Sequence, residues 1–315
     1  MHRGSSGREA SRGVVGHGWG VVVISPKQSC DILATMTKAI SVRIGCEFGL
    51  SAEVPTHVVI QVEPSRTDRI AIVQERWKFD ADCRRQGYRD GYGNLCQRLD
   101  LPAGPFSIRY DAVVEVPSSL DDADESAAEI APGALPDDVL VYTLPSRYCL
   151  SDELGDEAWR LFGAMTPGWG RVQAICDHVH TSVTWQAGAS SPRTTAADVY
   201  ASCLGVCRDF AHLAISFCRA LNIPARYAFG YLPDIGVEPD GNPMDFCAWM
   251  EVWLGDRWYT FDPRNNERRV GRVVVGRGRD ALDCAMLTSY GNAALQTILV
   301  WADEESSDVP RATLE

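Results

Sequence analysis

The chain has 315 residues, of which 45% are hydrophobic and 23% charged, and its formal net charge is -12 at pH 7. This length is about twice that of a typical domain, so we expect a soluble globular protein of two domains. Nucleic-acid surfaces need clustered lysine and arginine, so the acidic balance argues against DNA or RNA as a partner. The sequence has no apolar run of about twenty residues, so no membrane partner is expected either.

The number and distribution of cysteines indicate the cellular compartment of the protein. The 11 cysteines are odd in number and scattered along a chain of ordinary hydrophobic content. This pattern is typical of reduced thiols rather than of a disulfide scaffold, and it predicts a cytoplasmic protein. Residues 1–38 lack the basic start and long apolar core of a signal peptide. We interpret them as a disordered leader, with Met36 as an alternative start and an ordered extra strand as the competing interpretation.

Residues 39–117 are expected to form a β-rich domain. Strand-like runs cover residues 40–50, 57–62, 69–77, 93–101 and 106–116, and proline, aspartate and glycine separate them. This pattern, without a convincing helix, predicts a β-sandwich-like fold. Arg84, Arg85, Tyr88 and Arg89 are interpreted as part of a solvated loop rather than a binding patch.

The pattern changes after an acidic stretch. Residues 118–138 carry seven acidic and no basic residues, and we expect them to form a linker. Helices are then predicted over 151–162, 169–183 and 207–221, with a shorter one beginning at Thr195. A second domain is therefore expected over 139–300, followed by a disordered tail over 301–315. Its loop 232–243 contains three prolines and is a candidate lid.

Cys207 is the main candidate for chemistry. It follows the turn 203–206 and would stand in the first turn of a predicted helix. Unpaired backbone N–H groups and the positive end of the helix dipole favour a thiolate there, lowering the cysteine pKa from its usual value of about 8.5. The sequence therefore predicts a prepared nucleophile at Cys207.

A predicted hairpin adds further candidates. Gly255-Asp256 is a two-residue turn signal between the strand-like runs 246–254 and 257–262. Pairing of residue 254 with residue 257 places Trp249 opposite Asp262, and Cys247 becomes a diagonal neighbour of Asp262 at about 7 Å. In this geometry a carboxylate orients a group on the adjoining strand.

Three blocks of sequence carry a resemblance to a known family. They are residues 205–212 (GVCRDFAH), residues 220–231 (ALNIPARYAFGY), and residues 248–254 (AWMEVWL) leading to 258–263 (WYTFDP). Over about residues 40–299 the chain resembles the transglutaminase-like superfamily, specifically its bacterial two-domain members. The resemblance implies an α+β fold in which a β-sandwich-like domain precedes a papain-like core. In that core the helix that carries Cys207 would pack on an antiparallel sheet.

The resemblance also implies roles for individual residues. Cys207 occupies the nucleophile position and Asp262 the orienting-acid position, with Trp249 and Asp209 as supporting residues. Acyl transfer or hydrolysis of a peptide or a small amide or amine substrate is implied, with no cofactor and no metal. Cys247 stands where the family motif has histidine. A thiol is a poor proton acceptor and repels a neighbouring thiolate once ionised, so ordinary Cys-His-Asp chemistry is not expected.

The other histidines offer no obvious substitute base. His178 and His180 are two positions apart on a predicted helix and would face different sides of it. His212 follows Cys207 by five positions, which turns it roughly 140° around the helix, and we interpret it as structural. His57 lies in the β-rich domain.

Several interpretations follow. The first is a thiol enzyme of low or specialised activity, working without an imidazole base. The second is a catalytically silent module that binds an extended peptide or an acidic ligand through a run of arginines, although a solvated or strand-edge role for that run is simpler. The third is a redox latch in which Cys207 and Cys247 bond. A metal site of Cys203, Cys207, Cys247 and His212 matches no common zinc spacing. The arginine run comprises Arg264, Arg268, Arg269, Arg272, Arg277 and Arg279.

Overall fold

The computed structural model describes residues 38–67, 69–239 and 241–305, so the interpretations of residues 1–37 and 306–315 lie outside the described residues. The strands are β1 (Ala39–Ala52), β2 (Thr56–Ile60), β3 (Ala71–Phe79), β4 (Arg85–Arg89), β5 (Leu95–Leu101), β6 (Gly104–Pro117), β7 (Thr184–Trp185), β8 (Leu204–Gly205), β9 (Ala225–Tyr231), β10 (Cys247–Leu254), β11 (Arg257–Phe261), β12 (Val273–Gly278), β13 (Leu287–Ser289) and β14 (Ala293–Glu304). The helices are η1 (Pro132–Ala134), η2 (Leu140–Thr143), α2 (Gly155–Phe162), α3 (Trp169–Ser182), α4 (Ala196–Ser202) and α5 (Cys207–Ala220). The predicted α+β class is confirmed.

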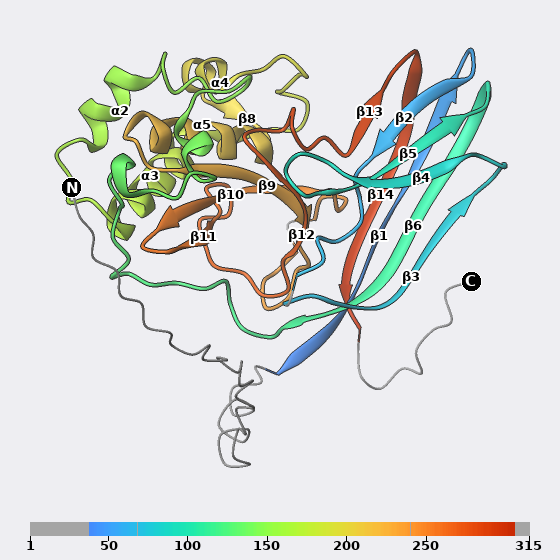
Figure 1. Ribbon diagram of the computed structural model, residues 1–315, viewed down its shortest axis with the longest axis horizontal. Coiled ribbons are helices and arrows are strands. Elements are labelled where there is room, and N and C mark those ends of the chain that lie inside the picture. The colour runs from blue at the N-terminus through green and yellow to red at the C-terminus, as the bar shows by residue number, and fades with distance from the viewer. Residues whose placement is uncertain (1–37, 68, 240, 306–315) are drawn as a thin grey trace, which may run out of the picture. The chain divides into compact units, whose positions relative to one another are not determined.

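Two four-stranded sheets make up the β-rich part of the fold (Figure 1), with strand orders β14-β1-β6-β3 and β13-β2-β5-β4. Side chains alternate between the two faces of a strand, so every second residue of β1 is buried. The inward residues of both sheets belong to one continuous core. This alternation is the pattern that indicated a sandwich-like region in the sequence. On β1 the inward residues are Val42, Ile44, Cys46, Phe48 and Leu50, none more than 2% exposed.

Strand β4 was not predicted. The sequence analysis interpreted this segment as a solvated loop, but Arg85 pairs with Leu99 and Arg89 with Leu95 on β5. β4 is the outer strand of its sheet and all of its residues are exposed, so it lacks the alternation of apolar residues that marks a half-buried strand. The loop interpretation was therefore wrong, although the exposure that it implied is correct.

The C-terminal part of the described chain returns to the β-rich region. Residues 301–304, expected in a disordered tail, belong to β14 and pair with β1, with Trp301 opposite Gly45. A Cβ added at Gly45 would lie 2.3 Å from the Trp301 ring, so this packing requires glycine. β13 likewise pairs with β2. Backbone pairing between segments far apart in sequence supplies order that local composition does not predict.

The second half of the chain contains the sheet β11-β10-β9-β12, against which α5 packs (Figure 1). α2, α3 and α4 contact α5 in turn, and none of the described helices is long and apolar enough to cross a bilayer. Burial of one phenylalanine or leucine side chain contributes about 1.5–3 kcal/mol, so the apolar stripe of α5 fixes the helix on the sheet. That predicted stripe, which is buried throughout, comprises Phe210, Leu213, Ala214, Phe217 and Leu221.

The predicted hairpin register is confirmed where the strands pair. Leu254 lies opposite Arg257, and Glu251 lies opposite Thr260. Cys247, Trp249 and Glu251 consequently share one face of β10, because side chains alternate along a strand. The intervening residues of β10 belong to the core that α5 also enters.

The acidic stretch 118–138 is anchored rather than free. Leu120 forms an isolated β-bridge with Val270, and the Asp121 carboxylate accepts hydrogen bonds from Arg272 at 3.1–3.3 Å. Asp122 is bonded by Arg69 from the β-rich region. The described residues 38–67, 69–239 and 241–305 belong to one compact unit.

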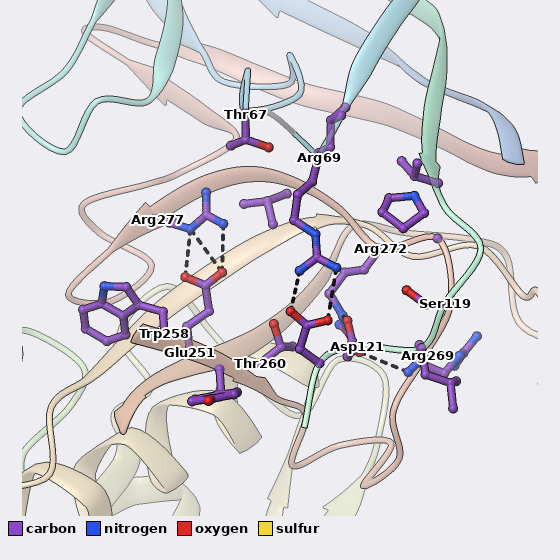
Figure 2. A pocket seen from close by; sticks show the side chains of 18 of the residues that line it. Thr67, Arg69, Ser119, Asp121, Glu251, Trp258, Thr260, Arg269, Arg272 and Arg277 are labelled. Atoms are coloured by element: carbon purple, nitrogen blue, oxygen red, sulfur yellow. Dashed lines mark hydrogen bonds and ion pairs between the residues drawn. The ribbon is translucent and has the colours of Figure 1, made fainter. Parts of the chain in front are cut away.

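These contacts close a polar cavity of about 260 Å³, shown in Figure 2, where Arg277 faces Glu251. Arg269 and Arg272 also line this cavity, and their side chains are only 6% and 4% exposed, so their interpretation as solvated residues was wrong. Arg277 lies on β12, the outer strand of its sheet, as the strand-edge alternative anticipated.

Candidate active site

The turn before α5 sets the position of Cys207. Val206 is the N-cap of α5 and Cys207 its first residue. The Asp209 carboxylate accepts hydrogen bonds from the Val206 N–H at 2.8 Å and from the Ser190 hydroxyl at 3.0 Å. A Cβ at Gly205 would lie 2.8 Å from the Asp209 Cβ, so this turn requires a glycine. Asp209 therefore supports Cys207 by holding the backbone of the turn.

The thiols of Cys207 and Cys247 meet at the start of α5 and β10. The pKa of Cys207 is lowered, first by a hydrogen bond from the Cys247 thiol, which outweighs the opposing effect of burial. The Ala248 backbone N–H and the charge of Arg264 lower it further. The sequence predicted the direction of this shift from the helix start, but the largest cause is the neighbouring thiol.

Cys247 is the protonated member of the pair. It is 7% exposed, and its pKa is raised well above the usual value by its hydrogen bond to Cys207, by burial and by the charge of Asp262. A thiol that holds its proton while its neighbour is ionised is a hydrogen-bond donor, not a base. The pair thus consists of a thiol whose pKa is lowered, Cys207, and a thiol whose pKa is raised, Cys247.

Asp262 follows β11 directly and is buried. One carboxylate oxygen accepts a hydrogen bond from the Asn265 side chain at 2.9 Å and from Arg272 Nη2 at 3.2 Å. The other accepts from the Asn265 backbone N–H at 3.0 Å. Asp262 therefore acts on Cys247 through its charge, while its hydrogen bonds orient Arg272 and the turn after β11.

Arg272 connects Asp262 with Trp249. Its guanidinium lies 4.4 Å from the centre of the fully buried Trp249 ring, an attractive cation–π geometry. Its positive charge lowers the pKa of Cys247, against the stronger effects that raise it. Trp249, expected as a supporting residue, thus packs against the Arg272 guanidinium, whose charge acts on Cys247.

The sequence analysis missed the roles of Arg272, Asn265 and Asp121. Asn265 follows Asp262 by three positions in Asp-Pro-Arg-Asn, a turn signal that predicts a side-chain to backbone hydrogen bond. Arg272 was noted only as one of several arginines. Nothing in the local pattern pairs Arg272 with Asp262 or with Asp121 in the acidic stretch.

Cys207 and Cys247 both line a cavity of about 800 Å³. Its walls include the start of α5, the segment 185–194, residues 232–238 and 242–246, and residues 281–287. The predicted lid loop is therefore part of the cavity wall. Aromatic side chains such as Trp185 and Phe246 alternate there with charged ones such as Arg208, Glu238 and Asp245. A ligand with both apolar and charged groups fits such a lining.

His212 is the described histidine that borders this cavity. The sequence analysis expected it to project away from Cys207, but the cavity extends along the first turns of α5. Its ring stacks on Tyr148 with centroids 5.2 Å apart, and Nε2 accepts a hydrogen bond from the Ala281 N–H at 3.2 Å. Burial lowers the pKa of His212 to about 3. His212 is therefore neutral and structural.

His178 and His180, considered as substitute bases, lie on different sides of α3. The His178 ring lies edge-on to Phe162, whereas His180 Nδ1 donates to the Arg264 carbonyl oxygen at 2.8 Å, so the two face different sides. Across residues 38–67, 69–239 and 241–305, no three His, Cys, Asp or Glu side chains are grouped as metal ligands.

The comparisons with known proteins agree with this geometry. A family model described as "Transglutaminase-like superfamily" matches residues 160–263, which include Cys207, Cys247 and Asp262. A solved structure from Cytophaga hutchinsonii, named "putative cysteine protease", is 30% identical, with a TM-score of 0.78 over 87% of this chain and 93% of that chain. The chain belongs to the transglutaminase-like superfamily. The resemblance found in the sequence is thereby confirmed.

Two mycobacterial relatives are also similar to this transglutaminase-like chain. An uncharacterized protein of Mycobacterium tuberculosis is 29% identical over 264 residues, which is 76% of this chain and 83% of that protein. One from Mycobacterium leprae is 35% identical over 122 residues, or 37% of this chain and 42% of that protein. The expected papain-like arrangement, a cysteine at a helix start packed on an antiparallel sheet, is present in this transglutaminase-like core.

Proposed function

We propose that this protein is a thiol-dependent acyltransferase or hydrolase that acts on amide or peptide bonds through Cys207. The observation that carries the proposal is the Cys207 thiol, which lines a cavity of about 800 Å³ and has a lowered pKa. A thiolate is the nucleophilic form of cysteine, so this environment prepares attack on a carbonyl carbon. The cysteine usage of the chain supports a cytoplasmic location.

Nucleophilic attack is the easier part of acylation. The Cys207 thiolate adds to the carbonyl carbon without help from a base, and the resulting tetrahedral intermediate becomes a thioester when the leaving group departs. Release of an amine then needs a proton, and the raised pKa of Cys247 makes this thiol a weak acid. General acid–base catalysis is typically worth about 10²–10⁴-fold, so we expect slow turnover of amides and faster reaction with esters and thioesters, whose leaving groups need less protonation.

Acyl-enzyme trapping tests the role of Cys207. The full chain is incubated with a nitrophenyl ester of a short N-acyl peptide, and the acylated cysteine is located by peptide mass spectrometry. We expect the adduct on Cys207, its loss in Cys207→Ala, and its retention in Cys203→Ala, which removes an exposed thiol at the end of α4. Acylation spread over other cysteines, or none, would contradict the proposal.

Restoring histidine tests the missing base. We expect Cys247→His to raise amide turnover by about 10²–10⁴-fold, because an imidazole can accept and return the proton that a thiol cannot. The double variant Cys207→Ala/Cys247→His is the matched control and should remain inactive. Steady-state release of a chromogenic amine measures both.

A second candidate is a catalytically silent module that binds a peptide or an acidic ligand in the same cavity. It is favoured by one observation: Asp262 is hydrogen-bonded to Arg272 instead of to a base. If the protein is such a binding module, Cys247→His should not raise the rate of amide turnover, whereas calorimetry should still detect binding of a peptide to the wild-type protein.

A further inference from the structure

We propose that Cys207 and Cys247 form a dithiol–disulfide exchange centre, in which Cys207 attacks a disulfide bond of a small peptide-like ligand and Cys247 resolves the mixed disulfide. This inference shares the nucleophile Cys207 with the proposed function but needs no acyl group. The sequence analysis expected only a disulfide between Cys207 and Cys247. The exchange centre adds an attacking role for Cys207 and a resolving role for Cys247.

The geometry of the pair supports exchange. Both thiols line one cavity, and Cys207 packs against the apolar patch to which Cys247 and Trp249 belong. Cys207 is half-buried, whereas Cys247 is only 7% exposed, and both line the cavity. An accessible attacking sulfur with a buried partner in contact is the arrangement that thiol–disulfide exchange requires.

The charges around the two thiols favour Cys207 as the attacking thiol and Cys247 as the resolving thiol. The Cys247 hydrogen bond that lowers the pKa of Cys207 prepares it as the attacking thiolate. A Cys207 sulfur in a mixed disulfide carries no negative charge and no longer accepts a strong hydrogen bond from Cys247, so the main effect that raises the pKa of Cys247 is removed. The Arg272 guanidinium, stacked on Trp249, then favours the Cys247 thiolate. Attack by Cys207 thus activates Cys247.

The steps balance with a disulfide as the oxidant. The Cys207 thiolate forms a bond to one ligand sulfur, the ligand S–S bond breaks, and the first ligand thiolate leaves. That thiolate takes the proton of Cys247. The Cys247 thiolate then bonds to the Cys207 sulfur and the second ligand thiolate leaves. The protein loses two electrons to the disulfide, which is reduced to one thiol and one thiolate.

This chemistry suits the site better than amide cleavage in one respect. A thiolate leaves without being protonated, because its pKa is far below that of an amine, so the step does not need the imidazole that position 247 lacks. The mixed apolar and charged lining, with Trp185, Phe246 and Arg208, fits a peptide disulfide rather than a bare oxidant.

The experiment uses the reduced full chain and oxidised glutathione as the probe. Products are alkylated and mapped by non-reducing peptide mass spectrometry, which distinguishes this pair from the other cysteines. In wild type we expect a Cys207–Cys247 disulfide and about two equivalents of released glutathione per disulfide formed. In Cys247→Ser we expect a stable glutathione adduct on Cys207, and in Cys207→Ser no reaction at Cys247.

The outcomes separate this inference from the proposed function. A persistent Cys207 adduct in wild type, two free thiols, or pairing of either cysteine elsewhere would overturn the exchange centre. None of these results alters acylation of Cys207 by the peptide ester. Conversely, a disulfide in wild type together with no ester acylation would remove the acyltransferase and leave the exchange centre standing. The wild-type result alone decides the matter if a variant fails to fold.

Discussion

Two ion clusters along one face of β10 have opposite compositions. Near the middle of the strand, the Glu251 carboxylate lies between the guanidiniums of Arg226 and Arg277. Near the strand start, the Arg272 guanidinium lies between the carboxylates of Asp121 and Asp262. The first is one anion held by two cations, and the second is one cation held by two anions.

The two clusters differ in what they hold together. The Glu251 cluster joins β9, β10 and β12 through Arg226 and Arg277. The Arg272 cluster uses Asp262, the position expected to orient a base, to hold an arginine beside Cys247. The Asp262 carboxylate is thus hydrogen-bonded to an arginine, and in the proposed exchange the reactive groups are the thiols of Cys207 and Cys247.

Removing the central residue of either cluster should have the largest effect on stability. Glu251→Ala leaves two partly buried guanidiniums without their buried counter-ion, and Arg272→Ala leaves the buried Asp262 and the partly buried Asp121 without theirs, so each should cost about 3–5 kcal/mol of unfolding free energy. Urea denaturation at neutral pH measures the loss. The exposed ion pair broken by Arg160→Ala on α2 is the control, and its loss should leave the unfolding free energy close to that of wild type.

The same cluster predicts an acid dependence. Burial alone would raise the pKa of Glu251, but the charges of Arg277 and Arg226 outweigh it and lower the pKa from its usual 4.5 to about 2. Its stabilising contribution is therefore complete above about pH 4.5 and is lost as the pH falls toward 2. The deficit of Glu251→Ala should shrink over that range, and a deficit independent of pH would contradict the ion-pair explanation.

Removing one outer member of a cluster should cost less. Asp262→Asn keeps the size of the side chain, and Asp121 still neutralises Arg272, so we expect a loss of about 1–3 kcal/mol. Equal losses for Asp262→Asn and Arg272→Ala would mean that Asp121 does not share the arginine. The same urea measurement decides it.

The parts of the fold predicted from the sequence are those with strong local patterns. The α5 stripe and the turn at Gly255-Asp256 specify a helix and a hairpin register by spacing alone, and both are observed. Strands β12, β13 and β14 were not predicted, because their pairing partners lie far away in the chain and their own alternation is weak. Local periodicity carries no information about such pairings.

In the candidate site too, some residues could be predicted from local sequence and others could not. Cys207, Cys247 and Asp262 follow from motif spacing, and the family resemblance places them together. Arg272 could not be assigned, because its partners Asp121 and Asp262 lie 151 and 10 positions away. The main cause of the lowered pKa of Cys207 was likewise hidden, since it is the neighbouring Cys247 side chain on a different element.

The smallest expected effect is a change in the pH profile of Cys207 alkylation. Iodoacetamide reacts with the thiolate, so the rate of labelling at Cys207 follows its ionisation. In Cys247→Ala the main cause of the lowered pKa is removed, so the profile should shift to higher pH and labelling near neutrality should slow several-fold. Cys203→Ala is the matched control and should leave the profile in place. An unshifted profile in Cys247→Ala would mean that the helix start alone lowers the pKa of Cys207. Cys247 would then have no effect on the ionisation of Cys207, and the position of Arg272 and Asp262 beside Cys247 would not bear on the reactivity of Cys207.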